Sequence, residues 1–271
     1  MIQKEIDKLV ILQSRLLLKY PEVIHCISTR VGGVSRGAYR TLNLSFMVGD
    51  KAECVLENRR RLASALTIKP ESITVGHQVH SCKVKVVQSV DRGKGGLNGL
   101  SAINHIDAMV TDKRSIALTA LSADCPLIIC YDPVKKVCAV IHSSWRGAVE
   151  GVVGRAIKNL KQNFASKPRD IIAVISPSIG PCCYEVKEDF IDIVRTLVPI
   201  PPRRDSFITR GKKTFFNLWS FNKNLLSQAG LRKPNIESAD LCTRHHPEWF
   251  YSFRRDGSRT GRFGALISLK I

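Results

Sequence analysis

The middle of the chain alternates between short apolar runs and polar breaks, a pattern typical of buried strands joined by turns. Two β-branched runs, 127–131 and 137–141, are separated by an Asp-Pro pair and two lysines. Runs of this length bounded by turn residues predict strands, and the short break between them predicts an antiparallel hairpin. Because antiparallel neighbours bring the start of one strand beside the end of the other, we expect Cys125 to lie close to His142.

Similar short runs occur on both sides of this hairpin, interleaved with helical patterns. The spacing of apolar residues predicts strands at 23–29, 73–79, 83–88, 106–111, 116–121 and 171–175, and helices at 50–66, 148–164 and 216–229. Residues 1–19 have an amphipathic pattern that predicts another helix. Interleaved strands and helices without a linker or an internal repeat predict a single compact α/β domain of the α+β type, with mixed β-sheets flanked by helices. We therefore expect a helical extension over 1–21 and one domain over 22–271.

Composition indicates an ordinary globular protein in a reducing compartment. The chain has 271 residues, of which 44% are hydrophobic and 24% charged, and no run approaches the roughly 20 apolar residues that a membrane span needs. Its N-terminus does not have the pattern of a signal peptide. An odd number of cysteines, nine, is expected to remain as free thiols. We therefore expect a cytoplasmic protein without a membrane span.

The net charge of +19 raises the possibility of an anionic partner. A basic nucleic-acid-binding protein is the non-enzymatic alternative that this charge supports. However, the lysines and arginines are scattered, and neither a basic tail nor an RNA motif with interleaved aromatic residues is present. We therefore do not expect nucleic acid to be the partner, and the charge is equally compatible with an anionic small-molecule substrate.

Cys125 and His142 combine a thiol with an imidazole, and a third group lies upstream. His77 and His80 are three residues apart at the end of a predicted strand, so their side chains would face opposite sides and one of them could join the pair. Two histidines and a cysteine leave a fourth position open, as in a catalytic zinc site. Copper also suits such a set, but the seven histidines of the chain are too few for the centres of a multicopper oxidase.

A metal-free alternative uses the same residues. In a Cys/His hydrolase or deamidase, Cys125 would be the nucleophile and His142 the base that activates it.

Two further groups of thiol and imidazole side chains are present later in the chain. Cys182 and Cys183 are adjacent, and adjacent cysteines rarely form an unstrained disulfide, so they are interpreted as packing residues. Cys242, His245 and His246 have the composition of metal ligands but lack a second pair at zinc-finger spacing. No structural zinc is therefore predicted from either group.

From about residue 22 onward the chain contains, in this order, the runs TRVGGVSRGAYRTLNLSFMVGD, ENRRRLA, QVH, DAMVTD, ADCPLIICYDP, VIHSSWRG, SIGPCCYEV and FRRDGSRTGRFGALI. These runs resemble, in the same order, the motifs of the "laccase domain" or multicopper polyphenol oxidase family. The family includes bacterial purine nucleoside phosphorylases and the animal laccase domain-containing protein. Its motifs imply a zinc held by His80, Cys125 and His142, which selects His80 over His77. The chain departs from the family where it has HSSWRG for HAGWRG, and Met47 where a histidine is common.

The resemblance also implies the reaction. It implies phosphorolysis of adenosine, inosine, guanosine and methylthioadenosine, together with deamination of adenosine at the same site. The expected cofactor is zinc rather than copper, and the expected partners are purine nucleosides and inorganic phosphate. We expect Arg59 and Arg146 to bind the phosphate, because a guanidinium group suits that anion, and Ser45 and Gln78 to form a polar wall.

Overall fold

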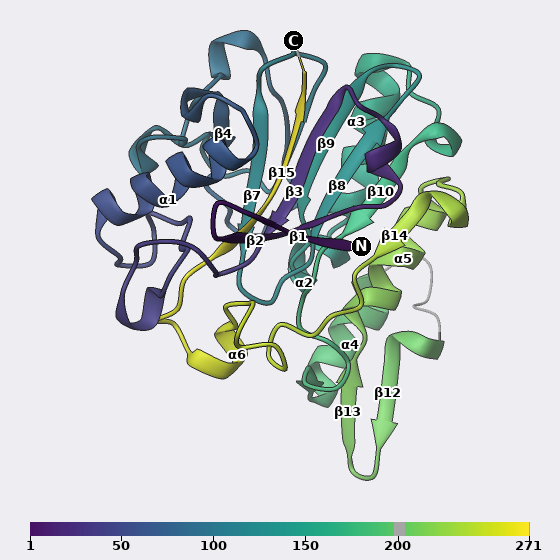
Figure 1. The fold of residues 1–271 in the computed structure, drawn as a ribbon. Coiled ribbons are helices and arrows are strands. Elements are labelled where there is room, and N and C mark those ends of the chain that lie inside the picture. Colours follow the sequence, from purple (N-terminus) through teal and green to yellow (C-terminus); the bar gives the residue numbers. More distant parts are fainter. Residues whose placement is uncertain (198–203, 271) are drawn as a thin grey trace.

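The computed structural model describes residues 1–197 and 204–270, in which the strands form three sheets (Figure 1). The first sheet has the order β1 (Ile2–Ile6), β2 (Leu9–Gln13), β3 (Val23–Ser28), β15 (Phe263–Leu269), β7 (Ala117–Ser122) and β4 (Ile73–Val75). The second has the order β14 (Ile236–Ser238), β10 (Ile172–Ile175), β8 (Leu127–Asp132), β9 (Val137–His142), β6 (Ala108–Thr111) and β5 (Val84–Val86). A small third sheet consists of β11 (Glu185–Val186), β13 (Lys213–Phe216) and β12 (Phe207–Arg210).

The strands β8 and β9 are central in the second sheet, and both of their faces are buried. Leu127 and Ile129 of β8 pack against the first sheet, whereas Ile128 and Cys130 pack on the opposite, helix-covered face. A strand buried on both faces requires a continuous apolar run, which is the pattern seen in the sequence. The predicted antiparallel hairpin is therefore confirmed, with Leu127 directly opposite His142.

The two large sheets pack face to face, and helices cover both outer faces (Figure 1). The described helices are α1 (Ala52–Ala65), α2 (Trp145–Val149), α3 (Val152–Phe164), α4 (Glu188–Leu197), α5 (Leu218–Gln228) and α6 (Phe253–Asp256). Helix α1 packs on the first sheet through Leu62, and α3 packs on the second through Val153, Ile157 and Leu160. This arrangement confirms the predicted α+β fold with mixed sheets flanked by helices. None of the helices in the described ranges has the length and apolarity that crossing a membrane requires.

The N-terminal segment forms a β-hairpin, so the helix predicted over 1–19 is wrong. Asp7 and Lys8 have positive φ angles of 49° and 70° and form the tight turn between β1 and β2. Leu9 and Ile11 pack toward α1, and Leu12 packs toward the second sheet. Alternate residues of β2 therefore face opposite sides, as in a strand. The same amphipathic sequence could have formed a helix, but pairing with β3 stabilises the extended conformation.

The strand predicted over 73–79 is shorter than expected, and the helix predicted over 148–164 is interrupted. Strand β4 ends at Val75, so 77–80 is not a strand, and the argument that placed His77 and His80 on opposite strand faces is wrong. The helix predicted over 148–164 is divided into α2 and α3 at Gly151, whose φ of 92° is readily adopted by glycine.

His25 is buried in the first sheet in its neutral form. Its side chain is 2% exposed, and its Nε2 accepts a hydrogen bond from the backbone N–H of Ser14 at 2.9 Å. Burial lowers the pKa of His25 from the ordinary 6.5 to about 4. Between these two values the unfolded chain binds a proton that the folded chain does not. The stability present above pH 6.5 is therefore lost as the pH falls toward 4.

We expect this group to make the wild-type protein about 2 kcal/mol less stable at pH 5 than at pH 7. His25→Gln does not titrate in this range, so the variant should lose that part of the pH dependence. Urea unfolding of both proteins at the two pH values measures the difference. An identical pH dependence in the two proteins would show that His25 does not cause it.

Candidate metal centre and substrate pocket

The side chains of His80, Cys125 and His142 converge in a pocket of about 760 Å³. Their ligand atoms, one from each residue, all lie within 4.8 Å of one another. The prediction that Cys125 lies close to His142 is therefore confirmed, and the structure places His80 rather than His77 beside them. Two imidazoles and one thiol form a set that suits a transition metal.

The hairpin explains why Cys125 and His142 meet. His142 is the last residue of β9 and pairs with Leu127, the first residue of β8. Cys125 lies two residues before Leu127 and is half-buried. The register of one antiparallel pair therefore fixes the positions of both side chains.

Asp107 connects the histidines and was not identified from the sequence. Its Oδ1 lies 2.8 Å from Nδ1 of His142 and accepts the backbone N–H of His80 at 3.0 Å. Its Oδ2 accepts both the backbone N–H and the hydroxyl of Ser81, at 2.7 and 2.8 Å. The carboxylate thus orients the His142 ring and leaves Nε2 as the nitrogen available to a metal or to the Cys125 sulfur.

The electrostatics of this group follow from burial and hydrogen bonding. Burial opposes the charge on Asp107, but the hydrogen bonds from His142 and Ser81 outweigh it and lower the pKa of Asp107 to about 2. Burial alone would lower the pKa of His142, yet its hydrogen bonds to Asp107 and Cys125 raise that pKa to about 9. His142 therefore interacts with an ionised carboxylate on one side and a thiol on the other.

His80 reaches the site from an irregular segment. Its φ of 62° lies in the left-handed region, and its ring centroid is 4.9 Å from that of His142, with the ring planes at 81°. Burial, followed by the charge of His142, lowers the pKa of His80 to about 4, so its imidazole is neutral and able to bind a metal. His77 instead lies against His105, with ring centroids 5.5 Å apart.

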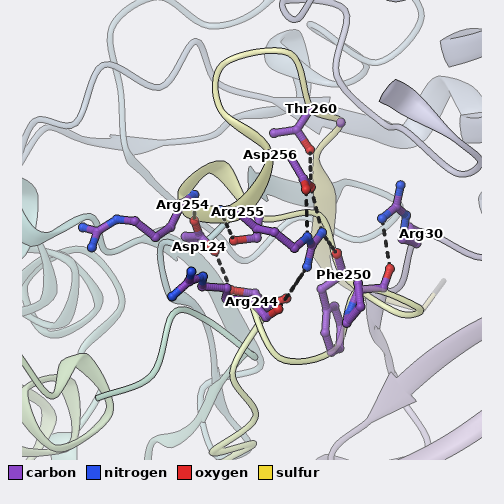
Figure 2. Close-up of polar contacts among 12 residues, drawn as sticks. Arg30, Asp124, Arg244, Phe250, Arg254, Arg255, Asp256 and Thr260 are labelled. Atoms are coloured by element: carbon purple, nitrogen blue, oxygen red, sulfur yellow. Dashed lines mark hydrogen bonds and ion pairs between the residues drawn. The ribbon is translucent and has the colours of Figure 1, made fainter. Parts of the chain in front are cut away.

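The loop before Cys125 is anchored by Asp124. Its carboxylate accepts a hydrogen bond from Thr243 Oγ1 at 2.5 Å. It accepts another from the backbone N–H of Arg254 at 2.6 Å (Figure 2). Arg255 contacts both carboxylate oxygens of Asp256 and donates to the backbone carbonyl of Thr243 at 3.0 Å. The C-terminal part of the chain thus holds the segment that carries Cys125.

Gln78 and Ser45 line the pocket, but their polar atoms have partners in the protein. The Gln78 amide donates to the Leu121 carbonyl and accepts from the Leu121 N–H, each at 2.8 Å. This pair continues the pairing of β7 beyond the end of β4 and positions the segment that leads to His80. The Ser45 hydroxyl accepts the backbone N–H of Met47 at 3.1 Å. Their predicted role as a polar wall stays a prediction.

Arg59 also borders the pocket, but its guanidinium group contacts backbone carbonyls. It donates to Leu44 O through Nε at 2.8 Å, to Gly96 O through Nη1 at 2.8 Å, and also to Gly95 O. The residue is 3% exposed, and the ring of Phe46 covers its guanidinium group at 4.6 Å. These contacts favour a structural role over the predicted binding of phosphate, because most of its donors are already used.

Three other arginines line the pocket and keep donors available. Arg146, the candidate from the sequence, is exposed and stacks on Trp145 at 4.4 Å. Arg254 lies over Tyr184 at 5.0 Å, and Arg262 donates through Nη1 to two backbone carbonyls. Arg254 and Arg262 were not identified as site residues from the sequence. Both lie in the run FRRDGSRTGRFGALI, and its high arginine content was the feature of the sequence that could have indicated them.

Aromatic side chains complete the pocket. Those that line it are Phe46, Trp145, Tyr184 and Phe253. Such flat apolar surfaces beside guanidinium groups suit a ligand with an aromatic ring and an anionic group.

Comparison with known proteins gives consistent results. Residues 24–270 match the family model described as multi-copper polyphenol oxidoreductase laccase. The chain is 34% identical over 249 residues to the purine nucleoside phosphorylase YlmD of Bacillus subtilis, covering 92% of this chain and 89% of that protein. It is 30% identical over 248 residues to the adenosine deaminase RL5 of an unknown prokaryotic organism, covering 90% and 93%. The crystal structure of YlmD from Geobacillus stearothermophilus has a TM-score of 0.92 and 30% identity, covering 99% of this chain and 98% of that chain.

The contacts of Asp107 lead to a prediction about metal affinity. Asp107→Asn keeps the size of the side chain but removes the charge that faces His142, so we expect zinc affinity to fall by ~10–100-fold. Competition with a chromophoric chelator measures this affinity. Ser81→Ala is the control, since it removes one hydrogen bond to the same carboxylate without touching His142, and should have a smaller effect. Equal affinity in Asp107→Asn and the wild type would exclude this role of the carboxylate.

Proposed function

Because the chain belongs to the multi-copper polyphenol oxidoreductase laccase family, whose relatives include purine nucleoside phosphorylases and an adenosine deaminase, we propose that it is a zinc-dependent purine nucleoside phosphorylase that also deaminates adenosine at the same site. The proposed substrates are adenosine, inosine, guanosine and methylthioadenosine, with inorganic phosphate. The observation that carries the proposal is the convergence of His80, Cys125 and His142 in a pocket lined by arginine and aromatic side chains. The proposed catalytic domain spans 22–271. The nine free cysteines support the proposed cytoplasmic location.

The donor set fits zinc. One thiol and two imidazoles, with Asp107 bonded to the far nitrogen of His142, are the ligands and the outer partner of many catalytic zinc sites. A bound zinc would supply a Lewis acid that polarises an oxygen and lowers the pKa of water. The family description names copper, but within residues 1–197 and 204–270 no second cluster contains more than one histidine, so the histidine-rich centres of a multicopper oxidase lack ligands.

The residues of the pocket account for the binding of both substrates. Arg146 and Arg254 line the pocket, and neither has a carboxylate partner within the described parts of the chain. Arg254 Nη1 donates to the backbone carbonyls of Cys183 and Glu185, each at 3.4 Å, and its other N–H groups, like those of Arg146, remain available to hold phosphate. The aromatic side chains offer stacking surfaces for the purine. In phosphorolysis a phosphate oxygen bonds to the anomeric carbon while the bond to the purine nitrogen breaks and its electrons remain on the base. Arginines that hold the phosphate beside the sugar lower the entropic barrier of this step.

A second candidate function rests on one observation. Cys125, His142 and Asp107 are connected in the order of a thiol, a base and an orienting carboxylate, which is the arrangement of a cysteine hydrolase. In that reading Cys125 is the nucleophile and no metal is needed. Full activity in a preparation shown to contain no metal would favour it over the phosphorylase.

We expect Cys125→Ala, His142→Ala and His80→Ala each to lose one equivalent of bound zinc and nucleoside turnover, because each variant lacks one of three ligands. Products from a panel of nucleosides, incubated with and without phosphate, are identified by mass. His77→Ala is the control and should keep both properties, since its ring lies against His105. Retention of metal and turnover in His80→Ala would show that the ligand set is wrong.

The arginines are tested by comparing two reactions. Arg146→Ala and Arg254→Ala should each weaken phosphate binding by about 1.5–3 kcal/mol, the scale of a hydrogen bond to a charged group. The phosphate concentration needed for ribose-1-phosphate release should therefore rise by roughly 10–150-fold. Deamination of adenosine uses water, so the formation of inosine should change much less.

Two variants on α1 serve as controls for the arginines. Arg60→Ala removes an exposed guanidinium about 100° around the helix from Arg59 and should change neither reaction. Arg59→Ala should reduce both reactions and the stability together, because its contacts are with backbone carbonyls. Equal losses of both reactions in Arg146→Ala and Arg254→Ala would mean that these residues hold the nucleoside or the fold instead of phosphate.

A further inference from the structure

A second cluster of thiol and imidazole side chains lies outside the substrate pocket. Cys182 and Cys183 come from the loop between β10 and β11, and Cys242 and His245 from the loop after β14. Their four ligand atoms, three sulfurs and one imidazole nitrogen, all lie within 4.8 Å of one another. None of the four residues lines the pocket that contains Cys125.

Backbone pairing brings the two loops together. Ser178 and Cys242 form a parallel β-bridge, and the N–H of Thr243 donates to Ser178 O at 3.1 Å. The chain then turns at Gly180, whose carbonyl accepts the N–H of Cys183 at 2.9 Å. A Cβ atom at Gly180 would lie 2.6 Å from the ring of Trp219, so the close approach of this turn requires glycine.

The side chains face one another across this junction. Cys183 Sγ lies 3.2 Å from His245 Nε2, and Cys242 Sγ accepts the backbone N–H of Gly180 at 3.3 Å. Cys183 and Cys242 are 5% and 4% exposed, whereas His245 is exposed and closes the cluster on the solvent side. The three cysteines also pack within an apolar cluster, but packing alone does not require their sulfurs to converge on an imidazole.

Three thiols and one imidazole form a complete tetrahedral ligand set for one metal. In a tetrahedral site with Zn–S bonds of about 2.3 Å, neighbouring sulfurs lie about 3.8 Å apart, so the observed spacing requires only small movements of side chains. We propose that Cys182, Cys183, Cys242 and His245 bind a structural Zn²⁺ ion. This closed Cys₃His site has no open position, unlike the set of His80, Cys125 and His142, and the inference does not depend on the proposed function.

The ion would join two segments that support the substrate pocket. Ile179 and Tyr184, on either side of the cysteine pair, line the pocket, and Thr243, next to Cys242, bonds to Asp124 beside Cys125. Metal bound between these loops stabilises the folded state, because the unfolded chain does not hold the four ligands together.

The number of metal ions bound by each variant tests the inference. The full chain is purified with reductant, stripped with a chelator, reloaded with zinc and desalted. Elemental analysis then gives the zinc bound per protein. We expect two equivalents in the wild type, one in Cys125→Ser, and one in the double variant Cys182→Ser/Cys242→Ser. Cys54→Ser, which removes a thiol of α1 outside both clusters, should keep two.

A pair of adjacent histidines provides a test that leaves the core intact. His245→Ala removes an exposed ligand, and His246→Ala removes its neighbour, whose Nδ1 contacts Glu248 and whose ring stacks on Trp249. With Cys125→Ser as background, only the second site binds zinc. His245→Ala should then weaken zinc binding by more than the ~10–100-fold that loss of an outer-shell partner causes, whereas His246→Ala should leave it unchanged.

The coordination itself is measured by X-ray absorption at the zinc edge. The Cys125→Ser protein should show three sulfur neighbours for its zinc, and the double variant only one. A chelator should lower the melting temperature of Cys125→Ser, and leave unchanged that of the triple variant Cys125→Ser/Cys182→Ser/Cys242→Ser, which lacks ligands in both clusters. One equivalent of zinc in the wild type, retained in the double variant, would overturn the inference. Equal zinc affinity in His245→Ala and His246→Ala would overturn it too, as would a disulfide between Cys182 or Cys183 and Cys242 in protein purified with reductant.

Discussion

The carboxylate of Asp107 connects the separate segments that build the candidate metal centre. It accepts hydrogen bonds from the loop that carries His80 and from the ring of His142 at the end of β9. Because Asp107 directly precedes β6, which pairs with β9, its position is set by the second sheet itself. A buried carboxylate is stable only when several donors hydrogen-bond to it. The donors from His80, Ser81 and His142 therefore keep fixed positions around Asp107.

The rest of the pocket depends on loops that extend from the same end of the two sheets. Segments leaving β7 and β9, and the irregular segment after β4, bring Cys125, His142 and His80 together, and the buried sandwich between the sheets keeps their spacing fixed. The C-terminal segment adds Arg254 and Arg262 and anchors the Asp124 loop. The zinc proposed at Cys182, Cys183, Cys242 and His245 would stabilise the wall of the pocket that contains Ile179 and Tyr184.

The different environments of Arg59 and Arg146 show that the residue type alone does not predict which arginine can bind a ligand. Arg59 and Arg146 look equivalent in the sequence, but Arg59 is buried with its donors on backbone carbonyls, whereas Arg146 is exposed toward the pocket. The N-terminal hairpin is a similar case, because an amphipathic pattern over 1–19 is satisfied by pairing with β3 instead of by a helix. In both cases the hydrogen-bond partners lie far along the chain: Leu44 and Gly96 for Arg59, and strand β3 for β2.

Three features could be predicted from the amino-acid sequence: the hairpin of β8 and β9, the proximity of Cys125 to His142, and the mixed α+β fold. These features depend on local periodicity and on the pairing of neighbours separated by a short turn. Tertiary structure alone decided the role of Asp107, the contribution of Arg254 and Arg262, and the meeting of Cys182 and Cys183 with Cys242 and His245. The physical reason is that these contacts form only after two sheets have packed and their loops have converged, and no short-range pattern of apolar and polar residues encodes that convergence.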